Sequence, residues 1–387
     1  MKLVKAHPRN PGDGKPIEKE KSLNEIKFNK FKFNNRPVPD KSQILIITCF
    51  SEFGCESIAL MYCIPEIIQK NPGAYVICVG WYGREYLYRH LCDEYWEIQE
   101  EFQWLRESAA AFVQTSKNIH RLEESLNDYG KVFKGESMGY LCLGNTCRDC
   151  KNFFDDEDEN CVCSKCKSSN IERSLLADIP YHKKFAIKIP RPSMSMLKKA
   201  EAYLKPNSVG IFARGRVAYG RNLGPEFYVK LIKNLEDKGY NPIWLGEKQS
   251  VLPCPVDHII DFSRLPEARN LELTLAIVSQ LKFTVQFWTA STRLASMMDV
   301  PWILVESPDQ IAGNGQEGKR IALTTDFNKK KILVCHYHSF KENEEKALNL
   351  VNQAIDEVNQ DNWDDIIGLV DQPEFIKMLL SKQEMWK

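Results

Sequence analysis

The sequence predicts an α/β protein of two domains, each built on a parallel sheet that helices cover on both faces. Short apolar runs of strand length alternate with amphipathic stretches of helix length from Gln43 to about residue 360. This alternation is typical of parallel sheets. The chain has 387 residues, which is enough for two cores, and Pro190-Arg-Pro192 divides the series into two halves of similar size.

In the first half, the apolar runs predict strands and the amphipathic stretches between them predict helices. The expected strands are residues 44–49, 74–79, 95–98 and 185–189. The expected helices are residues 55–69, 83–92 and 101–126.

In the second half, the same alternation continues after a connecting helix at residues 194–204. The expected strands are residues 209–213, 242–245, 258–261, 283–287, 302–305 and 332–335. The expected helices are residues 226–238, 271–280, 292–298 and 342–358, and residues 363–386 also have a helical pattern that Pro373 interrupts.

These patterns predict four parts. Residues 1–40 form a polar, basic arm with ten Lys or Arg against five Asp or Glu, in which Phe28, Phe31 and Phe33 are the candidates for packing. Residues 41–192 form the first domain, with a cysteine-rich insertion at about 140–172. Residues 193–360 form the second domain, and residues 361–387 form C-terminal helices.

Composition excludes several classes of protein. Lys and Arg together equal Asp and Glu, so the formal net charge is zero, which argues against broad, charge-driven binding of nucleic acid. No apolar run is long enough to span a bilayer, and the first residues lack the apolar core of a signal peptide. Thirteen cysteines, several of them in strand-like runs, indicate a reducing cytoplasm.

The segment Phe212–Arg221 predicts an anion site. The apolar strand before it leads into a loop with three arginines and several glycines, and a helix pattern begins at Pro225. Glycines permit close approach of a ligand, guanidinium groups bind phosphate oxygens, and a helix N-terminus favours anions. The candidate ligands of the anion are Arg214, Arg216 and Arg221. The alternative is a solvated basic loop, and the segment matches neither the Walker nor the dinucleotide fingerprint.

The insertion carries two C-x-x-C motifs, Cys147–Cys150 and Cys163–Cys166, twelve residues apart. Four thiolates in this spacing predict a structural Zn²⁺ site in a zinc ribbon, with no open position for catalysis. Cys161 could take the place of Cys163 in this set, and unliganded or redox-active thiols are the alternative to a metal site. The acidic run between the motifs resembles a D-x-D sugar-transferase signature, but it does not follow a strand, so we interpret it as a solvated turn.

Taken together, the second half resembles the donor domain of heptosyltransferase-like enzymes with the GT-B fold of two Rossmann-like domains. The resemblance rests on residues 209–221, Tyr240–Glu247, Ile260–Leu265 and Phe287–Pro301, and in the first half on Ser51–Ser57 and Gly83–Tyr88. It covers roughly residues 43–360 without the insertion. The sequence has Thr289-Ala-Ser-Thr292 where the family usually has Asp-Ser-Gly, which leaves the donor contacts there open.

The resemblance implies a glycosyltransferase that moves a sugar from a nucleotide-diphosphate sugar to a hydroxyl acceptor without a catalytic metal. The diphosphate would bind the three arginines, helped by Ser291 and Thr292, whose alternative role is to cap the helix that follows. Glu306 would bind the ribose, with a surface acid as the alternative. Gly246 and Glu247 would line the pocket of the base. The catalytic base would be Glu52 or Glu56, which follow the first strand, although Glu56 also suits the first turn of a helix.

Other functions remain open at this stage. A sugar-nucleotide epimerase can share the two-domain architecture, and a non-catalytic module could bind a nucleotide or a partner through the zinc ribbon. The acceptor class is open between a glycan, a lipid-linked acceptor and a modified DNA base. His336 and His338 are a further candidate metal pair, with packed or exposed strand histidines as the alternative.

Overall fold

The computed structural model describes two compact units, an N-terminal unit that ends at Ile189 and a C-terminal unit that begins at Pro190. Its described residues are 26–50, 61–99, 102, 117–133, 143–147, 153–154, 166, 171–175, 189–215, 223–248, 251–287, 292–306, 330–334, 341–359 and 366–368. Each unit has its own parallel sheet, so the α/β class predicted from the sequence is confirmed. In the described part of the chain, no helix is long and apolar enough to cross a membrane.

The N-terminal unit is a five-stranded sheet with the order β1-β4-β3-β2-β5. Its strands are β1 (Phe28–Lys32), β2 (Ile44–Cys49), β3 (Tyr75–Gly80), β4 (Glu94–Ile98) and β5 (Lys131–Phe133). Strands β2 to β5 are parallel, and β1 runs antiparallel to β4 at the edge. The other elements are η2 (Lys41–Gln43), α2 (Met61–Lys70), α3 (Glu85–Tyr88) and α5 (Lys117–Leu126).

The burial of this sheet follows from its sequence. All residues of β2, β3 and β4 are buried, as expected for parallel strands covered on both faces. One face packs against α5 through Leu122 and Leu126, in a cluster with Ile44, Ile46 and Trp96.

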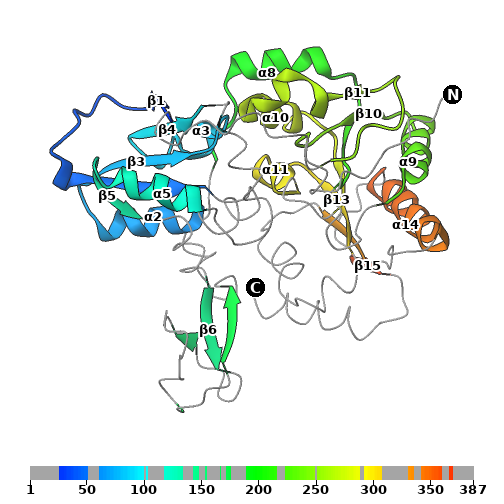
Figure 1. Ribbon diagram of the computed structural model, residues 1–387. Coiled ribbons are helices and arrows are strands. Elements are labelled where there is room, and N and C mark those ends of the chain that lie inside the picture. The colour runs from blue at the N-terminus through cyan, green and yellow to red at the C-terminus, as the bar shows by residue number, and fades with distance from the viewer. Residues whose placement is uncertain are drawn as a thin grey trace. The chain divides into compact units, whose positions relative to one another are not determined.

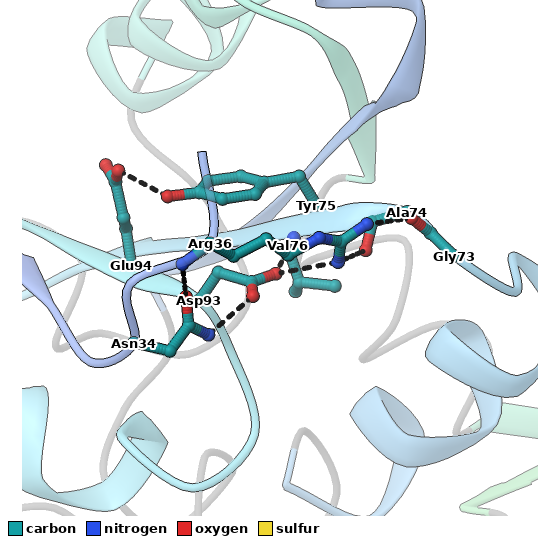
Figure 2. A network of polar contacts seen from close by, with 8 residues as sticks. All are labelled: Asn34, Arg36, Gly73, Ala74, Tyr75, Val76, Asp93 and Glu94. Atoms are coloured by element: carbon teal, nitrogen blue, oxygen red, sulfur yellow. Dashed lines mark hydrogen bonds and ion pairs between the residues drawn. The ribbon is translucent and has the colours of Figure 1, made fainter. Parts of the chain in front are cut away.

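Strand β1 corrects the prediction for residues 1–40, because Phe28–Lys32 is part of the sheet. The segment after β1 is also held in place (Figure 2). The Arg36 guanidinium donates hydrogen bonds to the carbonyls of Gly73 and Ala74 and lies 3.6 Å from Asp93. Asp93 also accepts from Asn34 at 2.6 Å and from the backbone of Val76 at 2.7 Å. Polar residues that resemble a solvated arm therefore bind the N-terminal ends of β3 and β4.

A separate antiparallel sheet of three strands lies within the predicted cysteine-rich insertion. Its strands are β6 (Leu143–Cys147), β7 (Phe153–Phe154) and β8 (Ile171–Leu175), in the order β7-β6-β8. Cys147 is the last residue of β6 and pairs in register with Ile171 of β8.

The C-terminal unit is a seven-stranded parallel sheet with the order β11-β10-β9-β12-β13-β14-β15. Its strands are β9 (Ser208–Phe212), β10 (Asn241–Trp244), β11 (Ile260–Asp261), β12 (Thr284–Phe287), β13 (Trp302–Glu306), β14 (Lys330–Val334) and β15 (Ile366–Gly368). Its helices are α8 (Met194–Ala200), η6 (Glu201–Tyr203), α9 (Pro225–Asp237), η8 (Phe262–Arg264), η9 (Pro266–Arg269), α10 (Leu271–Val278), α11 (Thr292–Met297) and α14 (Lys341–Asn359).

Figure 1 shows this sheet between α9 and α14 on one side and α10 and α11 on the other. Val209, Ile211 and Ala213 pack into one apolar cluster with buried residues of α9 and α14. A Cβ on Gly210 would lie 2.8 Å from the Leu281 side chain and 2.9 Å from the Leu245 side chain. The opposite face of β9 is therefore also closely packed at this residue. Both faces of β9 are therefore covered, and a ligand can approach this strand only at its end.

Strand β15 corrects the prediction of helix over residues 363–386, because Ile366–Gly368 pairs in parallel with β14. A three-residue strand gives almost no periodic signal, and its apolar residues fit a helical pattern equally well. Most of the strand predicted at 185–189 and most of the helix predicted at 101–126 lie outside the described residues.

Candidate functional site

The strand order of the C-terminal unit reverses beside β9. From β9 the chain moves outward to β10 and β11 and then returns to β12 on the other side of β9. The segments that follow β9 and β12 therefore leave the sheet in opposite directions. In open parallel sheets, ligands bind at such a switch point beyond the carboxyl ends of the strands. We call this place the C-terminal switch crevice, bounded by Phe212 of β9 and Phe287 of β12.

Arg214 lies at this crevice, two residues beyond the end of β9. Its side chain is only 6% exposed. A guanidinium group that is kept out of water in a sheet of apolar strands needs anionic or hydrogen-bonding surroundings. Of the three predicted arginines, Arg214 is the one among the described residues, and it is placed where the sequence predicts an anion site.

The residue after Arg214 fixes the path of the loop. A Cβ on Gly215 would lie 2.5 Å from the backbone nitrogen of Leu252 and 2.5 Å from the carbonyl carbon of Val251. Only glycine allows two backbones to approach this closely. The loop after β9 therefore packs directly on residues 251–252, which follow β10.

Residues 251–252 are themselves held from two sides. The Trp244 indole donates to the Leu252 carbonyl at 2.8 Å, and Arg264 donates to the Val251 carbonyl at 3.3 Å. Gly246, which the sequence places at the nucleotide base, has φ of +126° and a close approach to Val251. The loops after β9 and β10 thus form one packed surface beside the crevice, and sequence reasoning missed the part of Val251 and Leu252 in it.

The start of α9 differs from the expectation that its N-terminus favours an external anion. The backbone N–H of Gly224 donates to the Glu344 carboxylate of α14 at 2.7 Å, and Pro225, the first helical residue, has no N–H to offer. A carboxylate of the chain therefore already occupies this helix terminus. Glu344 lies 120 residues along the chain from Gly224, so no local pattern indicates the contact.

Contacts along both helices hold Glu344 in this position. Side chains of α14 bind the side chains of α9 and of the turn that follows it. The pairs are Asn234 with Asn352, Lys238 with Asp356, and Tyr240 with Asn359. Figure 1 shows α9 and α14 side by side.

The remaining predicted donor residues are only partly described. Thr292 is the first residue of α11, which follows β12, and Glu306 is the last residue of β13, the strand next to β12. Both belong to the edge of the sheet that holds the crevice. Arg216, Arg221 and Ser291 lie outside the described residues.

The N-terminal unit has a switch point of its own. Its chain moves from β2 to β3 and β4 and then returns to β5 on the other side of β2. We call the place beyond the ends of β2 and β5 the N-terminal switch crevice. The Thr48 hydroxyl, near the end of β2, donates to the Glu123 carboxylate of α5 at 2.6 Å and lies 3.4 Å from the carbonyl of Phe133, the last residue of β5. The predicted bases Glu52 and Glu56 lie outside the described residues.

A second buried acid, Glu97, stands on β4 away from this switch point. Its carboxylate accepts from the Gly83 backbone at 2.7 Å and from the Asn29 side chain at 3.2 Å. Burial raises the pKa of Glu97, and these two hydrogen bonds partly oppose that shift. Glu97 thereby fixes the turn after β3, where Gly83 has φ of +75°.

Two cysteines of the described segments, Cys78 and Cys254, are not poised for nucleophilic chemistry. Burial, together with contacts from Cys49 and Cys92, raises the pKa of Cys78 well above that of an ordinary thiol. Burial also raises the pKa of Cys254 to about 11. A thiol in this range remains protonated at neutral pH and is a weak nucleophile and metal ligand.

The predicted zinc ligands are described in part. Cys147 ends β6, Cys166 is exposed, and Cys150 and Cys163 lie outside the described residues. Among the described residues, no group of three or more His, Cys, Asp or Glu side chains is arranged to hold a metal ion. His336 and His338 also lie outside them.

No family model and no curated protein matches the chain. Among solved structures, a glycosyl transferase of family 9 from Veillonella parvula is 10% identical, covers 83% of this chain and 100% of its own, and gives a TM-score of 0.48.

Two Escherichia coli structures are also similar. Heptosyltransferase WaaC with ADP-2-deoxy-2-fluoro heptose is 15% identical, covers 81% of this chain and 99% of its own, and gives a TM-score of 0.40. ADP-heptose lps heptosyltransferase II is 10% identical, covers 82% of this chain and 99% of its own, and gives a TM-score of 0.43.

Proposed function

We propose that the protein is a glycosyltransferase of the GT-B type, which moves a sugar from a nucleotide-diphosphate sugar to a hydroxyl acceptor without a catalytic metal. The observation that carries this proposal is the C-terminal switch crevice with Arg214 at the end of β9. A parallel sheet with this strand order binds nucleotides at its switch point, and a guanidinium group is suited to diphosphate oxygens. The resemblance of the sequence to heptosyltransferase-like enzymes supports the same conclusion.

The proposed donor site extends from Arg214 along the C-terminal edge of the sheet. Arg214, Arg216 and Arg221 stabilise the negative charge that develops on the departing diphosphate. Ser291 and Thr292, which precede and open α11, add hydrogen-bond donors. Glu306 binds the ribose, and Gly246 lines the pocket of the base.

The start of α9 is not part of this proposed site, because Glu344 already supplies a carboxylate there. A phosphate beside Glu344 would meet a like charge and no N–H from Pro225. The arginines and the α11 side of the crevice are therefore the positions proposed for the diphosphate.

On the acceptor side, Glu52 or Glu56 is the proposed base for the acceptor hydroxyl. Both residues are in the segment that leaves β2 at the N-terminal switch crevice. A glycan, a lipid-linked acceptor and a modified DNA base remain the acceptor classes under consideration. A reducing cytoplasm, inferred from the thirteen cysteines, is part of the proposal.

A thermal-shift screen tests the donor site. The protein is heated with UDP, GDP, ADP, CDP or dTDP, each with and without EDTA. We expect one nucleotide to raise the Tm, because a ligand that binds only the folded state stabilises it, and EDTA to leave that shift unchanged. A shift that requires Mg²⁺ would contradict the metal-independent mechanism, and no shift with any nucleotide would favour a non-catalytic binding module.

A product analysis separates transfer from epimerisation. The sugar nucleotide that corresponds to the selected base is incubated with the protein, and the nucleotide products are separated by chromatography. A transferase releases the nucleoside diphosphate, whereas an epimerase returns an isomeric sugar nucleotide with its diphosphate linkage intact.

We also propose a structural Zn²⁺ held by Cys147, Cys150, Cys163 and Cys166. The antiparallel sheet of β6, β7 and β8 supports it, because Cys147 ends β6 and two C-x-x-C motifs suit a tetrahedral site. Elemental analysis of the purified protein is expected to find about one zinc per chain. The Cys150→Ser variant is expected to lose this zinc, whereas Cys254→Ser, which changes a thiol of the C-terminal unit, keeps it. A full complement of zinc in Cys150→Ser would contradict the proposed ligand set.

A further inference from the structure

One peptide group, between Val251 and Leu252, connects the loop that carries Arg214 to the side chain of Arg264. A Cβ on Gly215 would lie 2.5 Å from the carbonyl carbon of Val251 and 2.8 Å from its oxygen. The same oxygen accepts a hydrogen bond from the Arg264 guanidinium at 3.3 Å. Gly215 directly follows Arg214, so the peptide group that Arg264 binds also limits where Arg214 can lie.

Arg264 is itself held in a defined place. It is the last residue of η8, which directly follows β11. Phe262, the first residue of η8, is 1% exposed, and its ring packs edge-on against Tyr203 with 5.0 Å between the ring centroids. The Arg264 guanidinium lies 3.7 Å from the carboxylate of Asp261, the last residue of β11. The backbone and the charge of Arg264 are therefore both anchored at the end of β11.

The Asp261 carboxylate also binds the segment that contains Val251. It accepts a hydrogen bond from the backbone N–H of Cys254 at 3.0 Å. The ion pair of Asp261 and Arg264 thus binds residues 251–254 at two points, a backbone N–H and a backbone carbonyl. Side chains at the end of β11 consequently set the position of the backbone on which the loop after β9 rests.

We propose that Arg264, held by Asp261, is a positioning residue of the donor site, which acts through the Val251 carbonyl to fix the loop that carries Arg214. The inference rests on the proposed glycosyltransferase function, in which Arg214 binds the diphosphate of the donor. A hydrogen bond depends steeply on distance and angle, so a small displacement of the guanidinium of Arg214 weakens its contact with a phosphate oxygen. Arg264 therefore controls affinity for the diphosphate without touching it.

A purely structural role predicts a different result. Loss of a partly exposed ion pair changes the stability of the fold, whereas a role through Arg214 makes the effect on affinity depend on the presence of Arg214. Lys238 provides the matched control, because its ammonium binds Asp356 in the same unit and its side chain is 22% exposed, against 30% for Arg264. Lys238 follows α9, which is proposed to lie outside the donor site.

The experiment is a double-mutant cycle of Arg264→Met and Arg214→Ala. Isothermal titration calorimetry, well below the Tm of each variant, measures Kd for the one of UDP, GDP, ADP, CDP and dTDP that the thermal-shift screen selects. We expect Arg264→Met to raise Kd about five- to tenfold in the otherwise unchanged protein, and less than about twofold in the Arg214→Ala background. Lys238→Met is expected to keep Kd within about twofold of the unchanged protein.

Two results would overturn the inference alone. A Kd for Arg264→Met within twofold of the unchanged protein would show that the contact with Val251 is dispensable for binding. The same fold-change in both backgrounds would show that Arg264 acts independently of Arg214. By contrast, no binding of any of the five nucleoside diphosphates to the unchanged protein would overturn the donor site itself, and with it this role of Arg264.

Two conservative variants give an independent test if Arg264→Met does not fold. Arg264→Lys keeps the charge but loses the fork that reaches Asp261 and Val251 together, so Kd is expected to rise only about two- to threefold. Asp261→Asn removes the charge that holds Arg264, and Kd is expected to rise about threefold, with no rise in the Arg214→Ala background. An unchanged Kd in both Arg264→Lys and Asp261→Asn would contradict a role for this ion pair.

Discussion

The two sheets have the same kind of switch point but different side chains beside it. In the C-terminal unit, Arg214 lies beyond β9 and is 6% exposed. In the N-terminal unit, the Glu123 carboxylate lies beneath the end of β2, bound to Thr48. The strand order reverses at one strand in both units, and the side chains beside that strand differ: an arginine in one unit, and a carboxylate bound to a buried hydroxyl in the other.

The largest effect is expected from Arg214→Ala. Hydrogen bonds to a charged group contribute about 1.5–3 kcal/mol each, so affinity for the selected nucleoside diphosphate is expected to fall by roughly ten- to a hundredfold. Isothermal titration calorimetry measures this change. Arg269→Ala, which removes an exposed arginine of the same unit, serves as the control and is expected to keep the affinity. Equal affinities in the two variants would place the diphosphate away from β9.

The next effect concerns the packed loop. A methyl group at Gly215 would press on the backbone of Val251 and Leu252, so Gly215→Ala is expected to lower the free energy of unfolding by about 1–3 kcal/mol. It is also expected to weaken the nucleotide-induced Tm shift, because Arg214 moves with the loop.

Gly239→Ala is the control, since Gly239 has φ of +81° and open space around it. It is expected to cost about 1 kcal/mol through backbone strain, with the nucleotide shift retained. A retained shift in Gly215→Ala would separate the loop packing from binding.

A smaller effect is expected from Glu344→Ala. It removes the carboxylate that accepts from Gly224 at the start of α9, which is expected to cost about 0.5–2 kcal/mol in urea unfolding. The nucleotide-induced Tm shift is expected to be unchanged, because the diphosphate is proposed to bind away from α9. Glu345→Ala, its exposed neighbour, is expected to change neither quantity. Loss of the nucleotide shift in Glu344→Ala alone would return the start of α9 to the donor site.

The smallest effect is a pH dependence from Glu97. Burial raises its pKa in the folded state above the unfolded value of about 4.3. The folded state therefore binds the Glu97 proton more tightly than the unfolded state does. The resulting contribution to the free energy of unfolding is fully present below the unfolded pKa and is lost as pH rises through the folded pKa. In Glu97→Gln this loss is absent, so the Tm of the variant minus that of the unchanged protein is expected to increase with pH in the acid range. A difference that is constant or decreases from pH 4 to 7 would contradict the raised pKa.

The sequence predicted the parts of the fold that depend on local patterns. Strands such as Ile44–Cys49 are buried apolar runs, and α14 has a clear helical period, so their positions follow from the residues. Strand β1 was not predicted, because Phe28–Lys32 is mostly exposed and is fixed by pairing with β4. Short elements that depend on a partner strand leave little signal of their own.

The same distinction applies to the site. Arg214 follows an apolar strand and precedes a glycine, so its place at the carboxyl end of β9 could be predicted. Glu123 and Glu344 could not, because each acquires its role from a contact with a residue 75 or 120 positions away in the chain. Glutamates on amphipathic helices are ordinarily solvated, and only the tertiary contacts distinguish these two.

The most direct test of the account is a crystal structure with the selected nucleoside diphosphate bound. We predict that the diphosphate lies beyond β9 and β12, with its oxygens within hydrogen-bonding distance of the Arg214 guanidinium, and that Glu344 remains bound to Gly224. A diphosphate beyond the ends of β2 and β5 in the N-terminal unit would contradict the assignment of the donor site to the C-terminal unit.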